Sequence, residues 1–283
     1  MPDAKPDKSA GLKNKSATGH AYREDKDLLE LAAREAGSLA LQFFNRDPKV
    51  WTKGNNSPVT EADLAVDKML HERLLTARPD YGWLSEESED NDARLTKKRV
   101  FIVDPIDGTR AFIDGGSEWT ISLAIVEDQR PVAAALFAPV RGEMYLASKH
   151  GGSTLNGVAI TCPSLTSLQG ARAAGPRPAI HKGPLARAGV EGYGFVRSLA
   201  YRLVMITTGA LDIALARKDA NDWDLAAADL IIEEADGLLR DSQDAVLKYN
   251  RVCTCHDSLY AASKPLGTQI APLMPMLEFP QRR

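Results

Sequence analysis

Hydrophobic positions in the first quarter of the chain recur three and four residues apart, a spacing that predicts amphipathic helices. Residues 27–44 form one such helix with a single buried face, and a second begins at Glu61. Thr60 and Asp63 have the spacing of a capping box at the start of the second helix. Between the helices, residues 45–57 contain Pro, Gly and paired Asn, which indicates a loop.

The middle of the chain changes to short runs of β-branched and aromatic residues. Residues 81–85 and 100–103 are apolar without polar alternation, which is typical of buried strands. Three further runs, 119–127, 132–138 and 143–147, are separated by short turns. They predict consecutive antiparallel strands.

The composition shifts near residue 150 toward Ala, Gly and Pro, and a subdomain boundary is expected there. Residues 173–194 are rich in Pro and Gly and are predicted to be largely irregular. A helix over 198–208, a strand over 211–216 and a helix over 225–235 follow. The second half therefore also mixes helices with strands.

Residues 1–24 are polar and lack the apolar stretch of a secretory signal, so we expect a disordered tail. The predicted organisation is this tail, a larger α+β subdomain over 25–150 that carries the site, and a smaller α/β subdomain over 151–283 that completes it. The formal net charge of -3 argues against a nucleic-acid-binding protein. No apolar run reaches the roughly 20 residues that span a bilayer.

The three cysteines, Cys162, Cys253 and Cys255, form no C-x-x-C pair. We expect them to be small apolar residues in a reducing cytoplasm rather than disulfide partners. The five histidines are scattered without an H-E-x-x-H motif. A zinc hydrolase is therefore not indicated, and any metal should be a hard cation held by carboxylates.

The stretch richest in chemistry is residues 104–109, with the sequence DPIDGT. Asp104 stands at the carboxyl end of a predicted strand, which Pro105 should end because it has no N–H to donate. Asp107 follows, and then Gly and Thr introduce a turn into a helix. Two carboxylates beside free backbone N–H groups suit a metal and a phosphate together, although a turn capped by Asp107 fits the same residues.

Four carboxylates, Glu86, Asp104, Asp107 and Asp224, stand at the ends of predicted elements. Two like charges about 4 Å apart cost about 4 kcal/mol at an effective dielectric constant near 20, so a convergent set requires cations or protons. Carboxylates without His or Cys favour Mg²⁺, Mn²⁺ or Ca²⁺. Structural alternatives stay open, because Asp63 suits a capping box and Asp224 suits an N-cap.

Three segments together resemble the signature motifs of the inositol monophosphatase superfamily, whose members are Mg²⁺-dependent, lithium-sensitive phosphomonoesterases. The segments are Glu86-Glu87-Ser88, residues 104–109, and Trp223-Asp224-Leu225-Ala226-Ala227. The resemblance implies an α/β fold of layered α+β sandwich type, the inositol monophosphatase or sugar phosphatase-like fold. A larger antiparallel sheet with helices would precede a smaller C-terminal α/β part.

The resemblance also implies two or three Mg²⁺ ions as cofactors. Glu86, Asp104 and the carbonyl of Ile106 would hold one ion. Asp104, Asp107 and Asp224 would hold a second.

The remaining roles follow from the same resemblance. Glu87 would help to order a metal-bound water, and Thr109 with Asp63 would orient and deprotonate it. Gly108 and Thr109 would give backbone N–H groups to the phosphate. The reaction implied is hydrolysis by metal-activated water, without a covalent nucleophile.

Two departures from animal inositol monophosphatases concern the substrate. The segment Arg110-Ala111-Phe112-Ile113, which follows the DGT motif, resembles the corresponding segment of bacterial 3'(2'),5'-bisphosphate nucleotidases. Arg217, with Lys218 beside it, stands where the animal enzymes carry a Glu for the inositol ring. The expected substrate is therefore adenosine 3',5'-bisphosphate, with these three basic residues as candidate phosphate ligands, and inositol monophosphate is the alternative.

A non-catalytic metal- or ligand-binding regulator is the alternative from another class. Thr109 and Asp63 argue against it, because a binding protein needs no water-activating pair. The expected partner is a small phosphate ester in the cytoplasm, with no nucleic-acid polymer and no membrane. The oligomeric state stays open, a homodimer included.

Overall fold

The computed structural model describes residues 9–46, 48–53 and 57–279. The helices are α1 (Ser9–Phe43), α2 (Glu61–Ala77), η2 (Asp92–Thr96), α3 (Thr109–Ile113), α4 (Arg177–His181), α5 (Gly183–Arg187), α6 (Leu199–Val204), η3 (Met205–Thr208), α7 (Asp222–Glu234), α8 (Lys264–Ile270) and η4 (Ala271–Met276). The strands are β1 (Val50–Lys53), β2 (Ser57–Thr60), β3 (Gly82–Ser85), β4 (Arg99–Asp107), β5 (Thr120–Glu127), β6 (Arg130–Ala138), β7 (Glu143–Ser148), β8 (Gly152–Leu155), β9 (Val158–Ile160), β10 (Arg172–Ala174), β11 (Glu191–Gly192), β12 (Ile213–Ala216), β13 (Ala220–Asn221), β14 (Gly237–Asp241), β15 (Cys255–His256) and β16 (Leu259–Ser263).

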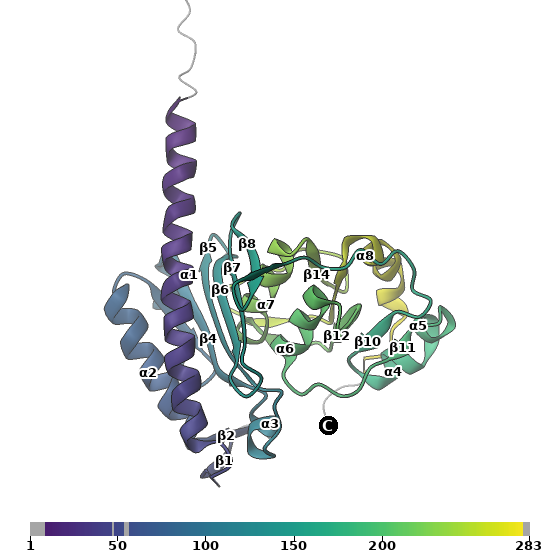
Figure 1. The fold of residues 1–283 in the computed structure, drawn as a ribbon, viewed down its shortest axis with the longest axis horizontal. Helices are drawn as coiled ribbons and strands as arrows, with labels where there is room; N and C mark the ends of the chain where they lie inside the picture. Colours follow the sequence, from purple (N-terminus) through teal and green to yellow (C-terminus); the bar gives the residue numbers. More distant parts are fainter. Residues whose placement is uncertain (1–8, 47, 54–56, 280–283) are drawn as a thin grey trace, which may run out of the picture.

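Helices and sheets alternate in five layers (Figure 1). Helices α1 and α2 cover one face of a seven-stranded sheet, and α6 and α7 lie between that sheet and a five-stranded sheet. Helices α4, α5 and α8 cover the outer face of the smaller sheet. This layered α/β architecture agrees with the expected fold class.

The seven-stranded sheet has the order β3-β4-β5-β6-β7-β8-β9, and only the β3–β4 pair is parallel. The three predicted antiparallel strands are confirmed as β5, β6 and β7. Asp128 and Gln129, with φ of 52° and 63°, form the turn between β5 and β6. Two successive positive φ angles are typical of the tight hairpin turns whose twist matches the flanking strands.

Strand β4 is buried on both faces, which explains why its sequence shows no polar alternation. Val100 and Ile102 pack toward α6 and α7, whereas Phe101 and Val103 pack toward α1 and α2. A strand covered by helices on both sides reads as a continuous apolar run. The burial extends to its carboxyl-terminal residue, Asp107.

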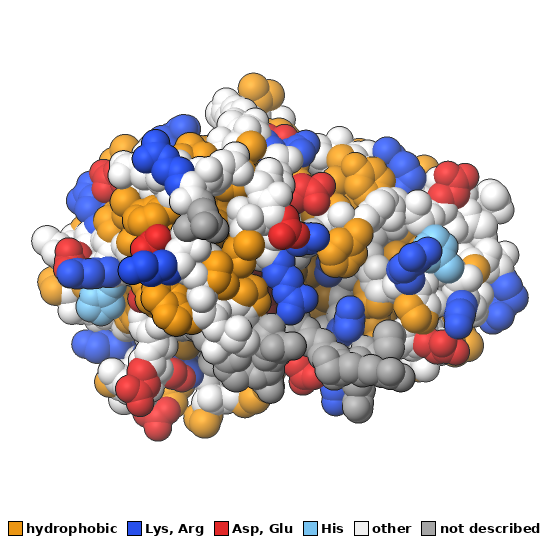
Figure 2. All heavy atoms as spheres, turned by 90° about the horizontal axis from the view of Figure 1, so that it is seen from below, with side chains coloured by type: hydrophobic (Ala, Val, Ile, Leu, Met, Phe, Trp, Pro, Cys, Tyr) orange, Lys and Arg blue, Asp and Glu red, His pale blue; other side chains and the backbone are white. Residues whose placement is uncertain are grey.

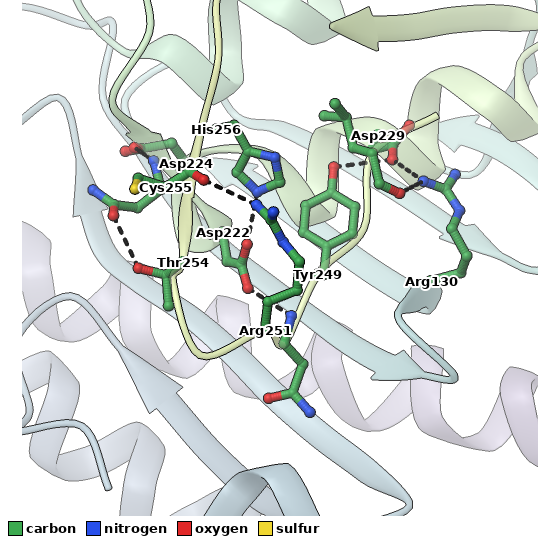
Figure 3. Close-up of polar contacts among 12 residues, drawn as sticks. Arg130, Asp222, Asp224, Asp229, Tyr249, Arg251, Thr254, Cys255 and His256 are labelled. Atoms are coloured by element: carbon green, nitrogen blue, oxygen red, sulfur yellow. Dashed lines mark hydrogen bonds and ion pairs between the residues drawn. The ribbon is translucent and has the colours of Figure 1, made fainter. Parts of the chain in front are cut away.

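Helix α7 is apolar nearly all round because it lies between the two sheets (Figure 1). Its buried polar residue Asp229 accepts hydrogen bonds from Arg130 Nη1 at 2.6 Å and from the Tyr249 hydroxyl at 2.9 Å. These contacts tie α7 to β6 and to the segment before β15 (Figure 3). The start of α7, with Asp224, is thereby fixed near the large sheet.

The predicted disordered tail over 1–24 is wrong for residues 9–24, which extend α1; residues 1–8 lie outside the described residues. Tyr22 is buried, and its hydroxyl lies 3.5 Å from Glu127 Oε1. Asp25, which is 1% exposed, accepts hydrogen bonds from Arg78, Tyr81 and Arg99 at 2.9–3.0 Å. These partners are distant in sequence, so local composition could not reveal the anchor.

Three other boundaries also differ from expectation. The large sheet continues past residue 150 to β9, and the second sheet begins only at β10. The predicted loop over 45–57 contains the β1–β2 hairpin, with residues 47 and 54–56 outside the described residues. The predicted irregular stretch over 173–194 contains the short helices α4 and α5, each of which has a proline in its first turn.

The cysteines divide into two kinds. Cys162 is buried, as expected, whereas Cys253 and Cys255 are exposed, so the expectation of apolar packing is wrong for them. No helix in the described ranges is long and apolar enough to cross a membrane. On the face at the bottom of Figure 1, acidic and basic side chains are interspersed over both halves (Figure 2).

We predict that Asp25→Asn destabilises the protein by about 2 kcal/mol, less than the about 3–5 kcal/mol of a fully buried ion pair. The smaller value is expected because Arg78 and Arg99 keep 30% and 14% of their side-chain surface exposed. Denaturant unfolding measures the change. The matched control is Glu24→Gln, at an exposed position of the same helix, which should shift the free energy of unfolding by less than about 0.5 kcal/mol. Equal effects of the two substitutions would contradict the anchoring role.

Candidate active site

The carboxyl end of β4 presents two carboxylates because the strand contains an irregularity. Asp104 pairs with Ser122 and Asp107 pairs with Thr120, so three steps on β4 match two on β5. Pro105 lies inside this bulge, where its missing N–H costs no ladder bond. The expectation that Pro105 ends the strand is therefore wrong.

Asp104, Asp107 and Asp224 converge. One carboxylate oxygen from each lies within 4.8 Å of the others, although Asp224 comes from α7 in the other half of the chain. Asp104 and Asp107 are buried and Asp224 is half-buried. Glu86 joins them from the end of β3, where its N–H donates to the Val103 carbonyl at 3.2 Å.

Burial raises the pKa of Asp104 well above its ordinary range, and the nearby charge of Glu86, Asp107, Asp224 and Asp63 raises it further. Its Oδ1 accepts the N–H of Ile106 at 3.0 Å. Its Oδ2 is buried and has no hydrogen-bond partner among the described residues. A buried carboxylate oxygen that faces other carboxylates fits a cation, since a metal ion would supply both the missing contact and the missing charge.

Asp107 is held from the second half of the chain. It accepts hydrogen bonds from the Ser198 hydroxyl, from the N–H of Ala200 at 2.7 Å and from the N–H of Leu199 at 3.3 Å. Burial raises the pKa of Asp107, and these donors lower it again in part. The contacts fix the carboxylate at the start of α6, so Asp107 does not cap its own turn.

Asp224 is the third residue of α7 rather than its N-cap, which is Asn221. Its Oδ2 accepts the Asn221 N–H at 2.6 Å, the reciprocal contact of a capping box. Figure 3 shows Asp224 at this helix end, beside the segment that carries Thr254 and Cys255. The N-cap prediction is therefore three residues off, because Asn221 is an equally good cap.

The two carboxylate oxygens of Asp63 contact different partners. Its Oδ2 accepts the Thr60 N–H at 2.8 Å, which confirms the predicted capping box. Its Oδ1 lies 3.4 Å from Thr109 Oγ1, which also lies 3.2 Å from the carbonyl of Ile106. The capping and catalytic interpretations of Asp63 are thus compatible.

Gly108 follows β4 with φ of 94°, in the left-handed region that favours glycine. A Cβ there would lie 3.0 Å from the Glu118 carbonyl oxygen and 3.2 Å from Ser198 Cβ. Helix α3 has only five residues, so its dipole is small. A left-handed residue followed by a right-handed one nevertheless turns successive N–H groups toward one point, an arrangement that binds anions.

The predicted basic residues have different environments. Arg217 is half-buried and Lys218 is exposed. Arg110 is exposed and lines an open cavity of about 310 Å³ together with Thr52, Pro58, Ile113, Asp114 and Arg197. Glu87 is half-buried, and its N–H donates to Ser85 Oγ at 3.3 Å.

Arg202 is a further basic residue that the sequence analysis missed. Burial lowers its pKa to about 10; the charge of Asp107 opposes this shift and that of Arg217 adds to it. Its Nη1 donates to the Val196 carbonyl, whereas its buried Nε has no partner among the described residues. Its spacing of four residues from Ser198 places both on one face of α6, a signal that becomes useful once Ser198 is known to bind Asp107.

Residues 22–273 match the family described as Inositol monophosphatase family. The chain belongs to this family. The relatives described below are named as phosphatases, and the chain is a phosphatase. Metal dependence, commonly on Mg²⁺, is typical of the family.

Relatives within the inositol monophosphatase family carry different substrate names. The 3'(2'),5'-bisphosphate nucleotidase CysQ of Aggregatibacter actinomycetemcomitans is 27% identical over 235 residues, which cover 80% of this chain and 87% of that protein. The inositol-1-monophosphatase of Rhizobium meliloti is 30% identical over 226 residues, which cover 76% and 84%. Similarity at this level establishes the family, not the substrate.

Solved structures of the family share the fold. An inositol monophosphatase from Zymomonas mobilis aligns with a TM-score of 0.74 and 27% identity, over 90% of this chain and 99% of that one. The suhB protein of Bartonella henselae aligns with a TM-score of 0.77 and 23% identity, over 88% and 97%. The fold predicted from the resemblance is confirmed.

We predict that metal-free protein loses stability as the pH rises above about 4, the ordinary pKa of Asp. Because the pKa of Asp104 is raised on folding, the folded chain keeps a proton that the unfolded chain has lost in this range, so the free energy of unfolding falls with pH. Asp104→Asn should flatten the fall and raise the melting temperature at pH 7 in the presence of a chelator.

Thermal melts from pH 4 to 8 with chelator, and again with Mg²⁺, measure this effect. Asp80→Asn, at an exposed position, is the control and should follow the wild type. Mg²⁺ should stabilise the wild type more than Asp104→Asn. An identical pH slope for Asp104→Asn and wild type would contradict the electrostatic interpretation.

Proposed function

We propose that this phosphatase is a 3'(2'),5'-bisphosphate nucleotidase that hydrolyses adenosine 3',5'-bisphosphate with Mg²⁺. The observation that carries the substrate assignment is a pair of arginines, Arg202 and Arg217: the charge of Arg217 helps to lower the pKa of Arg202, which the charge of Asp107 raises. Two like charges in a partly buried place are stable when an anion lies between them. A substrate with a second phosphate supplies that anion.

The metal part of the proposal rests on the carboxylates at the end of β4. Glu86, Asp104 and the Ile106 carbonyl would hold one Mg²⁺, and Asp104, Asp107 and Asp224 a second. When bound, Mg²⁺ lowers the pKa of water and offsets the charge of the phosphate. A third ion and sensitivity to lithium remain predictions from the family resemblance. A cytoplasmic location remains a prediction from the cysteines, and the oligomeric state stays open, a homodimer included.

Protein groups around the metal site would orient the reactants. Thr109 Oγ1 lies between Asp63 Oδ1 and the Ile106 carbonyl. It would accept a hydrogen bond from the attacking water and pass a proton to Asp63. The backbone N–H groups at Gly108 and Thr109 would bind the phosphate oxygens. Glu87 would help to order the water.

The names of the relatives support a nucleotidase assignment but do not decide between the two substrates. Several are named 3'(2'),5'-bisphosphate nucleotidase CysQ, but an inositol-1-monophosphatase is equally similar. Inositol hydroxyls call for acceptors such as carboxylates, whereas the basic pair favours a phosphate. Arginine suits this role, since its planar fork can pair with two phosphate oxygens.

We predict that Thr109→Val lowers kcat by about 100-fold or more, the lower range for loss of proton transfer. KM should change little, because the hydroxyl acts on the water rather than on the substrate. Phosphate-release kinetics measure both constants. Thr109→Ser keeps the hydroxyl and should retain most of the activity; a change confined to KM in Thr109→Val would assign the residue to substrate binding.

We predict that Arg217→Gln lowers kcat/KM on adenosine 3',5'-bisphosphate. The loss of transition-state stabilisation should be about 2 kcal/mol, the value of one charge-assisted hydrogen bond. Hydrolysis of a nucleoside monophosphate should change much less, since it lacks the second group. Lys218→Gln is the matched comparison and shows which of the two neighbouring cations binds. If the wild-type enzyme prefers inositol 1-phosphate to the bisphosphate, the substrate assignment is wrong, whereas the assignment of phosphatase activity still holds.

A further inference from the structure

Two exposed cysteines, separated by a single residue, lie beside the N-terminus of α7. Cys253 and Cys255 are free thiols at the surface, and Thr254 separates them. Even a fully extended chain advances by only about 3.4 Å per residue. The Cα atoms of Cys253 and Cys255 are then at most about 6.8 Å apart, which is within the range of disulfides.

The thiols interact with each other. Hydrogen bonds from the Cys255 side chain and backbone lower the pKa of Cys253, and the same pairing raises the pKa of Cys255. Cys253 therefore has the character of an attacking thiol and Cys255 that of a resolving thiol. The chain bends at Val252 and Cys253, so the segment before Thr254 is not a regular strand.

The segment that carries the cysteines is bonded to the cap of α7. Thr254 Oγ1 donates to Asn221 Oδ1 at 3.0 Å, and β15 pairs with β13 so that Cys255 lies opposite Asn221. The Asn221 N–H in turn donates to Asp224 Oδ2 at 2.6 Å. A chain of two contacts thus joins the dithiol to one of the converging carboxylates, as Figure 3 shows for Thr254, Cys255 and Asp224.

We propose that Cys253 and Cys255 form a redox-active dithiol that closes to an intramolecular disulfide and thereby weakens metal binding at Asp224. The oxidant is a small-molecule disulfide of the glutathione type. The Cys253 thiolate attacks one sulfur of this disulfide and releases the first small thiol. Cys255 then attacks the Cys253 sulfur and releases the second, so two protein thiols are oxidised and one disulfide is reduced to two thiols.

Closure changes the geometry around Thr254. The S–S bond of a disulfide is about 2.05 Å long, much shorter than the contact between two hydrogen-bonded thiols. The segment must therefore tighten, which strains the Thr254–Asn221 hydrogen bond and the β13–β15 pairing. The resulting shift of Asn221 removes an orienting contact from Asp224, and strained disulfides of this kind are easily reduced again.

The coupling to Asp224 rests on the proposed metal role of that residue, whereas disulfide formation does not. The test equilibrates the full-length protein with oxidised glutathione or with dithiothreitol, after which iodoacetamide blocks free thiols. Mass spectrometry then examines the tryptic peptide that begins at Val252, which holds Cys253 and Cys255 and no other cysteine. Calorimetric titration with Mg²⁺, without substrate, measures metal affinity in both states.

We expect the oxidised peptide to lack both alkyl groups and two hydrogen atoms, and the oxidised protein to bind Mg²⁺ about tenfold more weakly, the lower end for loss of a contact behind a metal ligand. Dithiothreitol should restore binding. The double variant Cys253→Ser/Cys255→Ser should bind Mg²⁺ with the affinity of the reduced wild type, and the oxidant should not change that affinity. Cys162→Ser, at the buried cysteine, should respond like the wild type.

Three results would overturn the proposal: mixed disulfides or intermolecular dimers without the intramolecular bond, unchanged Mg²⁺ affinity in the disulfide form, or an equal loss of affinity in the double serine variant. Failure of the reduced wild type to bind Mg²⁺ would instead count against the proposed metal site. The peptide measurement is independent of that outcome, so the two failures are distinguishable.

Discussion

Mutual repulsion of carboxylates at the end of β4 is the constraint on which the rest of the structure depends. Asp104 and Asp107 are buried, and Asp224 approaches them from another layer. At the spacing observed, each pair of charges opposes folding by a few kcal/mol, a sizeable fraction of the net stability of a domain. The surrounding fold must therefore hold the carboxylates together by packing, against this repulsion.

The packing that does so is centred on β4 and α7. Strand β4 is covered on both faces, and α7 is wedged between the sheets and tied by Asp229 to Arg130 and Tyr249. Neither element can move to relieve the repulsion without exposing apolar surface. The site thus draws its preorganisation from the hydrophobic burial of β4 and α7, together with the hydrogen bonds that hold Asp107 and Asp224.

Much of this organisation could be predicted from local sequence. The apolar run before Asp104 marked a buried strand, and the position of four acids at the ends of elements indicated that they would converge. The pairing of Thr60 with Asp63 was also readable, because a capping box is a contact between residues three apart. Each of these signals depends on neighbours in the chain.

The features that the sequence analysis did not predict depend instead on residues that are distant in the chain. Asp25 anchors α1 through partners 53, 56 and 74 residues away, so the polar composition around it suggested disorder. Arg202 becomes informative only through Ser198, whose contact with Asp107 spans 91 residues. The bulge at Pro105 is set by the register with β5, which a single strand does not reveal.

The bonds between Asp107 and the start of α6 have a consequence for the order of assembly. Asp107 belongs to the first half of the chain, and its three donors belong to the second. A nascent chain that has folded only the large sheet lacks these donors and also lacks Asp224. Such a chain cannot gather the converging carboxylates. With the catalytic role proposed for them, phosphate-ester hydrolysis would begin only when both sheets have docked, and activity would report complete folding of the polypeptide.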